Sequence, residues 1–511
     1  MSRAEIFCLA IAAPFMMTSM AWASTIEVGT DDNWCSIAND ADPGTTLELA
    51  PGDHMDTCHL RATGEEDAPI IIRSADPDDP ARLAYSGTGA NTIEVRSESR
   101  FVEIRDLHFP GTAGPHAIRF HSPTDITVAG NHFEQTGGVT MSANFSDSEP
   151  TRLHILDNSI FDVDTTAIYF GCHSGADDCR TVDAHIEGNT FYGLSSPGVG
   201  YAIQIKVDSN AVIRDNAIFD IQGPGVMVYG AHDDGTATSI IDGNLIVGSR
   251  DSGAILAGGG PAIITNNIVA DGATHGIHLY EHNVGAPQRD MVVAHNTVFD
   301  NQGTAIMASG WSDDSNVLAN NAIAPNGHSA IGGSPSGTVE GNIVCEDDGS
   351  DCFQAPNGDP FSLTPLIDGP LYEAVEALDD ADSLTEDFMG HERSATTHAG
   401  ALAHISDDGG PWFEIGQDRP PRVDDPSNGD DDDEDDSNGD EEPSNGHGDD
   451  DDDGDDSNGD EEPSNGEQEH SHDDDDDSNG GSCSATDNST SLVLLVLAMM
   501  GLVALRRRAT P

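Results

Sequence analysis

Positive charge is scarce in this chain, and lysine is almost absent. Lys206 is the only lysine among 511 residues, so 19 of the 20 basic side chains are arginines, against 92 acidic ones. The formal net charge of -72 makes nucleic acid and anionic membranes poor partners, because both favour a basic surface. Lysine can lose its proton where its surroundings demand it and arginine cannot, so Lys206 is a candidate functional residue.

Aromatic residues are also few, at 5%, and a long apolar stretch lies near each end of the chain. At the N-terminal end, a basic residue, an apolar stretch over 6–17 and Ala-Trp-Ala at 21–23 predict a signal peptide over residues 1–23. Export permits disulfides, and six of the remaining cysteines lie in close pairs. We expect the bridges Cys35–Cys58, Cys172–Cys179 and Cys345–Cys352, although spacing alone leaves other connectivities open.

The C-terminal end has three parts in order: Gly-Gly-Ser-Cys at 480–483, an apolar run over 492–505, and three arginines at 506–508. The apolar run is short for a membrane span. The order resembles the bacterial Gly-Gly and MYXO-CTERM sorting tags, which implies that a sorting protease acts on residues 482–511 with Cys483 as the sorting residue. An ordinary single-pass anchor is the alternative. In both cases we expect an exported protein at the cell surface or outer membrane, or released from it.

An acidic segment over residues 421–481 precedes this end. Residues 423–480 carry 29 Asp and Glu, and the phrase DDSNGDEEPSNG occurs at 435–446 and again at 455–466. Such a segment has nothing to bury, so we expect a disordered linker that its own charge repulsion extends. Calcium buffering is the alternative to a solvated spacer.

Between residues 101 and 344 one phrase recurs, an alternating apolar run followed by Asn-x-Ile/Phe/Val. Its asparagines are Asn131, Asn158, Asn189, Asn216, Asn244, Asn266, Asn296, Asn321 and Asn342, and Asp106 holds the equivalent place at the start. Intervals of 21 to 31 residues indicate a solenoid, in which each coil buries its face only against its neighbours. Asparagine tolerates the left-handed backbone of a sharp corner and can bond along the stack, so this ladder is predicted to be structural.

This pattern resembles the right-handed parallel β-helix family of the pectate-lyase-like kind. The resemblance implies an all-β helix of about 10–12 coils, with its repeats over residues 101–354. A cap and the first coils would occupy residues 24–100, and an extension over 355–420 would pack on the helix. Members of the family are mostly polysaccharide lyases, hydrolases, epimerases and adhesins, so the resemblance is specific for fold and weak for function.

The ladder aligns the second strand of each coil. One alternating set of residues is predicted to face the core: Ile118, Phe120, Ile203, Ile205, Val226, Val228, Ile277 and Leu279. The other set is predicted to face outward in two columns. The first column holds Arg119, Tyr169, Gln204, Met227 and His278, and the second holds His121, Gly171, Lys206, Tyr229, Gly258 and Tyr280. Lys206 is therefore expected beside Tyr229, one coil away.

The loops after these strands carry His173, His232 and His282, which we expect along the rim of the columns. The loops also hold aspartate pairs at 177–178 and 233–234, whose carboxylates are the ligands that calcium prefers. No loop shows a calcium-binding pattern such as that of an EF-hand. We therefore predict no metal site and keep Ca2+ only as an alternative.

β-Elimination on a uronate polymer requires a base, a proton donor for the leaving oxygen, and positive charge or hydrogen bonds for the carboxylate. The columns supply these types, with Lys206 and Tyr229 as the predicted catalytic pair. The predicted substrate-binding residues are Arg119, Tyr169, Gln204, His278, Tyr280, His173, His232 and His282. Several lyases of this fold use Lys or Arg as base, and the resemblance implies that role for Lys206. However, the formal charge of -46 on residues 24–420 favours the charged lysine, so a second assignment has Lys206 hold the carboxylate while Tyr229 or Tyr280 moves the proton.

The leading prediction is thus a monomeric polysaccharide lyase with an acidic polysaccharide as substrate. A non-catalytic adhesin or glycan-binding β-helix is the alternative, since a stalk and anchor display a binder equally well. A glycoside hydrolase comes third, because the outward columns contain no Asp or Glu pair suited to that chemistry. An ordinary surface lysine is the alternative for Lys206 itself.

Overall fold

The computed structural model describes residues 24–413 apart from 112–113, 174–177, 197–198, 233–234, 283–285, 359, 377, 379–383, 395 and 404–410. All of these residues belong to one compact unit, Met1–Asp433. The predicted signal peptide, acidic linker and sorting tag lie outside the described residues. Within the described part, no helix is both long enough and apolar enough to cross a membrane.

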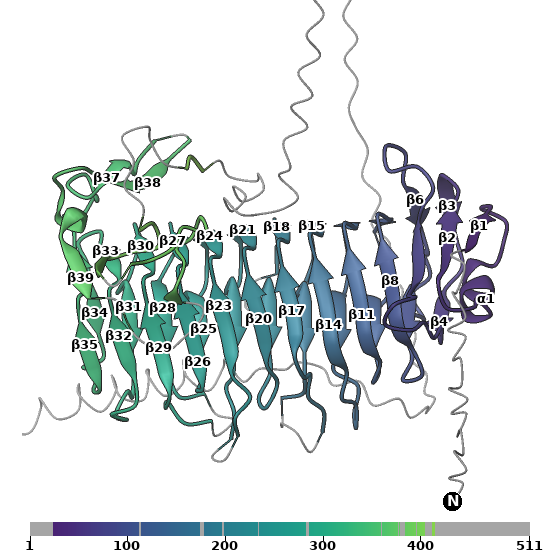
Figure 1. Ribbon diagram of the computed structural model, residues 1–511, viewed down its shortest axis with the longest axis horizontal. Coiled ribbons are helices and arrows are strands. Elements are labelled where there is room, and N and C mark those ends of the chain that lie inside the picture. Colours follow the sequence, from purple (N-terminus) through teal and green to yellow (C-terminus); the bar gives the residue numbers. More distant parts are fainter. Residues whose placement is uncertain are drawn as a thin grey trace, which may run out of the picture. The chain divides into compact units, whose positions relative to one another are not determined.

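The chain winds into an all-β parallel solenoid of three sheets, which confirms the predicted fold class (Figure 1). Every coil passes through the sheets in the same order, and each strand pairs in parallel with its equivalent one coil away. The 13-strand sheet consists of β1 (Ser24–Val28), β2 (Thr45–Leu49), β5 (Ile70–Ser74), β8 (Arg100–Arg105), β11 (Thr124–Ala129), β14 (Thr151–Leu156), β17 (Ala184–Glu187), β20 (Ala211–Arg214), β23 (Ser239–Asp242), β26 (Ala262–Thr265), β29 (Met291–Ala294), β32 (Val317–Ala319) and β35 (Thr338–Glu340).

The other two sheets complete each coil. The 12-strand sheet consists of β3 (Gly52–His54), β6 (Ala81–Leu83), β9 (His108–Pro110), β12 (His132–Glu134), β15 (Ser159–Phe161), β18 (Thr190–Tyr192), β21 (Ala217–Ile221), β24 (Leu245–Ser249), β27 (Ile268–Ala270), β30 (Thr297–Phe299), β33 (Ala322–Ala324) and β36 (Ile343–Val344). The 11-strand sheet consists of β4 (Cys58–Leu60), β7 (Ile93–Val95), β10 (His116–Phe120), β13 (Val139–Ala143), β16 (Ile168–Phe170), β19 (Ile203–Ile205), β22 (Val226–Val228), β25 (Gly253–Ala257), β28 (His275–Leu279), β31 (Ile306–Ala308) and β34 (Ile331–Gly332).

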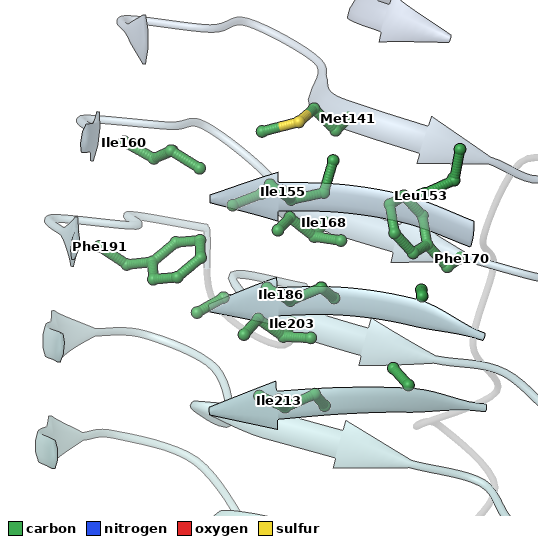
Figure 2. Close-up of a cluster of buried hydrophobic side chains, with 14 of the residues drawn as sticks. Met141, Leu153, Ile155, Ile160, Ile168, Phe170, Ile186, Phe191, Ile203 and Ile213 are labelled. Carbon is green, nitrogen blue, oxygen red and sulfur yellow. The ribbon is translucent and has the colours of Figure 1, made fainter. Parts of the chain in front are cut away.

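The core runs along the inside of the solenoid, where apolar side chains from all three sheets meet. Figure 2 shows this packing, with Ile186 from the 13-strand sheet, Phe191 from the 12-strand sheet and Ile203 from the 11-strand sheet pointing inward together. The predicted core set on the 11-strand sheet is fully buried, which confirms the alternation. Each buried Ile or Phe contributes about 1.5–3 kcal/mol by leaving water, so a coil is stable only with neighbours to cover it.

The asparagine ladder forms as predicted in kind but is displaced at two positions. The backbone N–H of Asn158 and its Nδ2 both donate to Asn189 Oδ1, at 3.0 and 2.9 Å, and the same bonds repeat from coil to coil. After Asn244 the ladder continues through Asn267 rather than Asn266, because Asn244 donates to Asn267 Oδ1. At the start, Leu107 and not Asp106 stands in the ladder, since its N–H donates to Asn131 Oδ1.

The left-handed backbone at this corner belongs to the residue before each ladder position. That residue is Asp, Gly, Asn or His, with φ between 52° and 68°, for example Asp157, Gly188 and Asn266. Asp, Asn and especially Gly tolerate this region best. Two duties that we predicted for a single asparagine are therefore divided between neighbours: one residue turns the chain and the next bonds along the stack.

Both ends of the solenoid are covered. The short helix α1 (Trp34–Asn39) packs the buried Trp34 against the first coils, and Cys35 bonds to Cys58 of β4. The bridges Cys172–Cys179 and Cys345–Cys352 are also present, which confirms the predicted connectivity.

After the last coil, β37 (Phe353–Ala355) pairs with β38 (Ser362–Pro365), η1 covers Pro370–Tyr372, and β39 (Ala374–Glu376) pairs with β40 (Thr396–His398) (Figure 1). This extension packs on the outer face of the 12-strand sheet, where its Phe388 joins Phe219 and Leu245 in a second apolar cluster. Arg393 Nη2 donates to Asn266 Oδ1 at 2.7 Å, and burial lowers the pKa of this arginine to about 10. Asn266 is therefore used to hold the extension.

Candidate functional site

The site lies on the 11-strand sheet, where β19 and β22 are neighbours in register. Gln204 pairs with Met227, so Lys206 and Tyr229 follow at equivalent positions just past the strand ends. Lys206 Nζ donates to the Tyr229 hydroxyl at 3.0 Å, and Gln204 Nε2 donates to the same oxygen at 3.0 Å. Three predicted site residues thus meet at one atom, because Lys206 and Gln204 both donate to the phenolic oxygen of Tyr229.

Aromatic rings enclose the lysine head group. Its Nζ lies 4.2 Å from the ring centroid of Tyr229 and 4.7 Å from that of Tyr169, on the coil before. Both distances are within the range of cation–π attraction. Lys206 is therefore held from both neighbouring coils, and its position is fixed by the stacking of the strands.

Two glycines make room on either side of this pair. A Cβ added to Gly171, one coil before Lys206, would meet Ser209 Oγ at 2.3 Å and Lys206 Cβ at 3.0 Å. A Cβ added to Gly258, one coil after Tyr229, would lie 2.8 Å from the Cβ of His282. The column thus places a glycine on each side of the Lys206–Tyr229 pair, and His282 occupies the space beside Gly258.

Two of the three rim histidines join the pair. His173 Nδ1 is 3.5 Å from Lys206 Nζ, and the ring of His282 lies 4.6 Å from that of Tyr229. The ring centroids of the two imidazoles are 5.8 Å apart, and the ring centroid of Tyr280 lies 5.9 Å from that of His282. A polar aromatic cluster therefore spans the coils from Tyr169 to Tyr280.

His232 bonds elsewhere. Its Nδ1 lies 2.6 Å from Asp208 Oδ2, and its backbone N–H donates to Asp208 Oδ1 at 2.9 Å. Asp208 was not predicted as a site residue, although it stands two residues after the only lysine. The shared rim position thus predicted two members of the cluster correctly, whereas the structure has His232 hydrogen-bonded to Asp208 instead.

Arg119 and His278 lie at the ends of the predicted stripe. Arg119 is on β10, two strands before Tyr169, and its guanidinium stands 5.0 Å from the Phe145 ring. His278 stacks beside Tyr280 at 4.7 Å, and burial together with the positive field of His275 lowers its pKa to about 4. His278 is therefore neutral at pH 7, when it can accept or donate a hydrogen bond but carries no charge for a carboxylate.

The columns point away from the core, but the prediction that they form an open surface is wrong at their centre. Lys206 is 4% exposed and Tyr229 is 3% exposed. Met227 and Tyr229 form a small apolar cluster with Leu256 and with Ala286 of the loop after β28. Ala286 thus packs against the ends of the neighbouring strands, and among these groups His173 is exposed and His282 is partly exposed.

The aspartates suggested for calcium fall mostly outside the described residues, which leave out 174–177 and 233–234. What the described residues define is a parallel β-helix with a buried lysine–tyrosine pair behind two histidines on one of its sheets. A lysine and a tyrosine joined by a hydrogen bond can exchange a proton with a ligand that reaches them.

Comparison with known proteins agrees on the fold. The model of the family described as right handed beta helix region matches residues 176–344. No curated protein matches the sequence. Among solved structures, an alginate lyase from Paenibacillus sp. str. FPU-7 is 18% identical, with a TM-score of 0.30, covering 63% of this chain and 99% of its own.

Two further solved structures are similar in the same way. The complex of XylC with xylose is 10% identical, covers 76% of this chain and 99% of its own, and has a TM-score of 0.48. The A-module of the mannuronan C-5 epimerase AlgE4 from Azotobacter vinelandii is 13% identical, with a TM-score of 0.40. This match covers 59% of the present chain and 87% of the epimerase module. At these identities the likeness concerns the fold alone.

Proposed function

We propose that this protein is a polysaccharide lyase that cleaves a uronate-containing polymer by β-elimination at the Lys206–Tyr229 pair. The observation that carries the proposal is the 3.0 Å hydrogen bond from the only lysine to a tyrosine hydroxyl that also accepts from Gln204. A tyrosine oxygen with two donors is stabilised as the phenolate, which is the form that acts as a base.

In this mechanism Tyr229 removes the proton from the carbon next to the uronate carboxylate. The electrons of that C–H bond form a carbon–carbon double bond, and the bond to the glycosidic oxygen breaks. The leaving oxygen takes a proton from His173, which is exposed and contacts Lys206. The ammonium of Lys206 balances the negative charge that collects on the carboxylate during the transfer.

The assignment of Tyr229 as base and Lys206 as positive charge follows from the donors around the phenolic oxygen. It also agrees with the acidity of the chain, because a field of negative charge favours the protonated lysine. Of the two roles that the sequence left open, we therefore prefer the one in which Lys206 stabilises charge and Tyr229 moves the proton.

The test is to incubate the full chain with alginate, pectate and other polyuronates and to follow the ultraviolet absorbance of the unsaturated product. We expect Lys206→Arg to lower the rate by about 100-fold, because the larger guanidinium keeps the charge but displaces the Tyr229 oxygen in this buried site, and a misplacement of about 1 Å can cost that much. The matched control is Arg105→Lys, an exchange of the same two residue types at a half-exposed position on the 13-strand sheet. A fully active Lys206→Arg variant would contradict the site.

A second candidate is a glycan-binding β-helix without catalysis. The burial of Lys206 and Tyr229 favours it, because catalytic atoms must reach the substrate. Under this alternative no polyuronate gives an unsaturated product, while glycan binding persists and depends on the accessible rings of His173 and Tyr280.

From the sequence alone we further propose that the protein is exported, acts as a monomer and is displayed by its acidic linker, after a sorting protease has removed the C-terminal tag. Mass spectrometry of the mature protein from its native host tests the tag and the signal peptide together. Intact residues at both ends would contradict the proposal.

A further inference from the structure

A second group of polar side chains lies on the outer face of the 12-strand sheet, away from the 11-strand sheet that carries Lys206. His108 on β9 and His132 on β12 are partners in the register of neighbouring coils. Glu134 follows His132 by two residues on the same strand, and the period of a strand places both side chains on one face. Two imidazoles and one carboxylate therefore converge from two coils.

The distances between their ligand atoms suit a single metal ion. His108 Nε2 is 3.3 Å from Glu134 Oε1, and His132 Nε2 is 3.6 Å from Glu134 Oε2. All three residues have ligand atoms within 4.8 Å of one another. Ligands about 2.0–2.1 Å from a tetrahedral ion stand roughly 3.4 Å apart, so small rotations of these side chains close the site.

The state of the histidine nitrogens points the same way. His108 Nε2 is shielded from solvent, and its polar contact among the described residues is the 3.3 Å approach to Glu134 Oε1, outside good hydrogen-bond geometry. A metal ion held by both atoms would satisfy this buried nitrogen better than the present contact does. The side chains of His132 and Glu134 are 43% and 39% exposed, so the fourth position of an ion here would face water.

The neighbouring sheet offers a contrast with the same sequence pattern. His154 and His185 are register partners on β14 and β17, and Glu187 follows His185 by two residues. There, however, His185 Nδ1 and Glu187 Oε1 already lie 2.7 Å apart, and this bond raises the pKa of His185. That carboxylate is engaged with its own histidine, whereas Glu134 lies between two.

From this geometry we propose that His108, His132 and Glu134 bind one divalent transition-metal ion of the Zn2+ type. Imidazole nitrogens favour zinc and its neighbours over calcium or magnesium, which prefer oxygen ligands. The ion links two coils across a loop of 24 residues, from His108 to His132, so it stabilises the N-terminal half of the stack. The site is independent of the proposed lyase activity, because it lies on another sheet.

The test is a titration of the full chain with Co2+, followed by its visible absorption, and then with Zn2+ as competitor. We expect a cobalt band that zinc abolishes, and a melting temperature that rises with either ion. His132→Gln and Glu134→Gln should each weaken binding by about 100-fold or more, beyond the 10- to 100-fold that outer partners of a metal site provide. Two variants are used so that one that folds poorly does not decide the result.

His185→Gln is the matched control, since it removes a histidine from the same pattern on the neighbouring sheet. It should leave the cobalt band and the affinity unchanged. The proposal is overturned if the folded His132→Gln and Glu134→Gln variants bind Co2+ as tightly as the unaltered chain, which would place the ion in the acidic linker or elsewhere. It is also overturned if the unaltered chain gives no cobalt band.

Discussion

Lys206 and Tyr229 are 23 residues apart in the chain, yet the lysine Nζ lies 3.0 Å from the tyrosine hydroxyl because the two occupy the same position in successive coils. Parallel strands in register bring such pairs together wherever the interval is one full coil. The pair is also buried, so each member is the other's polar partner in a place with little water.

Replacing the tyrosine with phenylalanine isolates this bond. We expect Tyr229→Phe to lower the lyase rate by about 100-fold or more, because the oxygen that moves the proton is lost. We also expect it to lower the free energy of unfolding by about 1–3 kcal/mol, since Lys206 and Gln204 lose an acceptor in a buried position. Rates on polyuronate and urea unfolding measure the two effects.

Tyr372→Phe is the control for that change, because Tyr372 is half-exposed in η1 of the extension. It should alter neither quantity. If Tyr229→Phe retained the full rate while losing stability, the tyrosine would be a structural partner of the lysine and the proton would move elsewhere.

The space above Gly258 is the next point to test. A side chain at this position meets His282 Cβ, so Gly258→Val should push the histidine away from Tyr229. A displacement of about 1 Å beside the reacting groups can cost up to 100-fold, and we expect a fall in kcat/KM of about 10- to 100-fold. Gly89→Val is the control, because nothing lies within 4 Å of a Cβ added there. Equal rates for the two variants would remove His282 from the site.

Substitution of a ladder asparagine should lower the stability of the protein without acting directly on the lyase activity. Asn189→Ala would deprive the buried N–H of Asn158 of its acceptor and the carbonyl of Ile155 of a donor. We expect a loss of about 2–5 kcal/mol in the free energy of unfolding, because two buried groups become unsatisfied. The exposed Asn357→Ala should cost almost nothing. Chemical denaturation compares them, and equal midpoints would contradict the role of the ladder.

The pH dependence of stability should reflect His295. Burial and the positive charge of Arg393 lower the pKa of His295 to about 2, from its ordinary value of 6.5. The unfolded chain then binds a proton that the folded chain does not, so stability is complete above about pH 6.5 and falls by about 1.4 kcal/mol per pH unit below it.

His295→Asn should remove this contribution. Asparagine is suitable because His295 has a φ of 55°, and Asn266 and Asn320 hold equivalent corners. Urea midpoints between about pH 7 and pH 4 should decline less steeply in the variant than in the unaltered chain. Parallel curves would show that His295 is protonated in the folded state.

The fold could be predicted because a solenoid repeats one local pattern many times. The ladder error at Asn266 shows the limit, because in Asn266-Asn267 either residue satisfies the repeat. In the structure, the pairing of Leu245 with Ile268 sets Asn267 in the ladder, and Asn266 instead contacts Arg393, 127 residues later. The alternation of the strands likewise identified the core without any knowledge of the loops. The local sequence pattern was therefore sufficient to predict both the solenoid and its core.

The site could be predicted in part for the same reason. Register alone placed Lys206 beside Tyr229, since every coil contributes one residue to the column. Burial could not be predicted, because Ala286, which packs in one cluster with Tyr229, comes from a loop two coils further on. The His108–His132–Glu134 group was not predicted, because these residues stand on the 12-strand sheet, outside the columns that hold Lys206.

The column through the site has a consequence for how such a protein can change in length. The column takes one residue from each of five successive coils: Gly171, Lys206, Tyr229, Gly258 and Tyr280. Which residues are neighbours in the column therefore depends on the number of coils between them. A whole coil gained or lost at either end would leave this count intact, because each coil contacts only its neighbours. Loss of the coil that carries Gly258 would set Tyr280 directly against Tyr229 and leave His282 no place. Duplication of coils can therefore lengthen the molecule before this stretch, while within it the number of coils is fixed by chemistry.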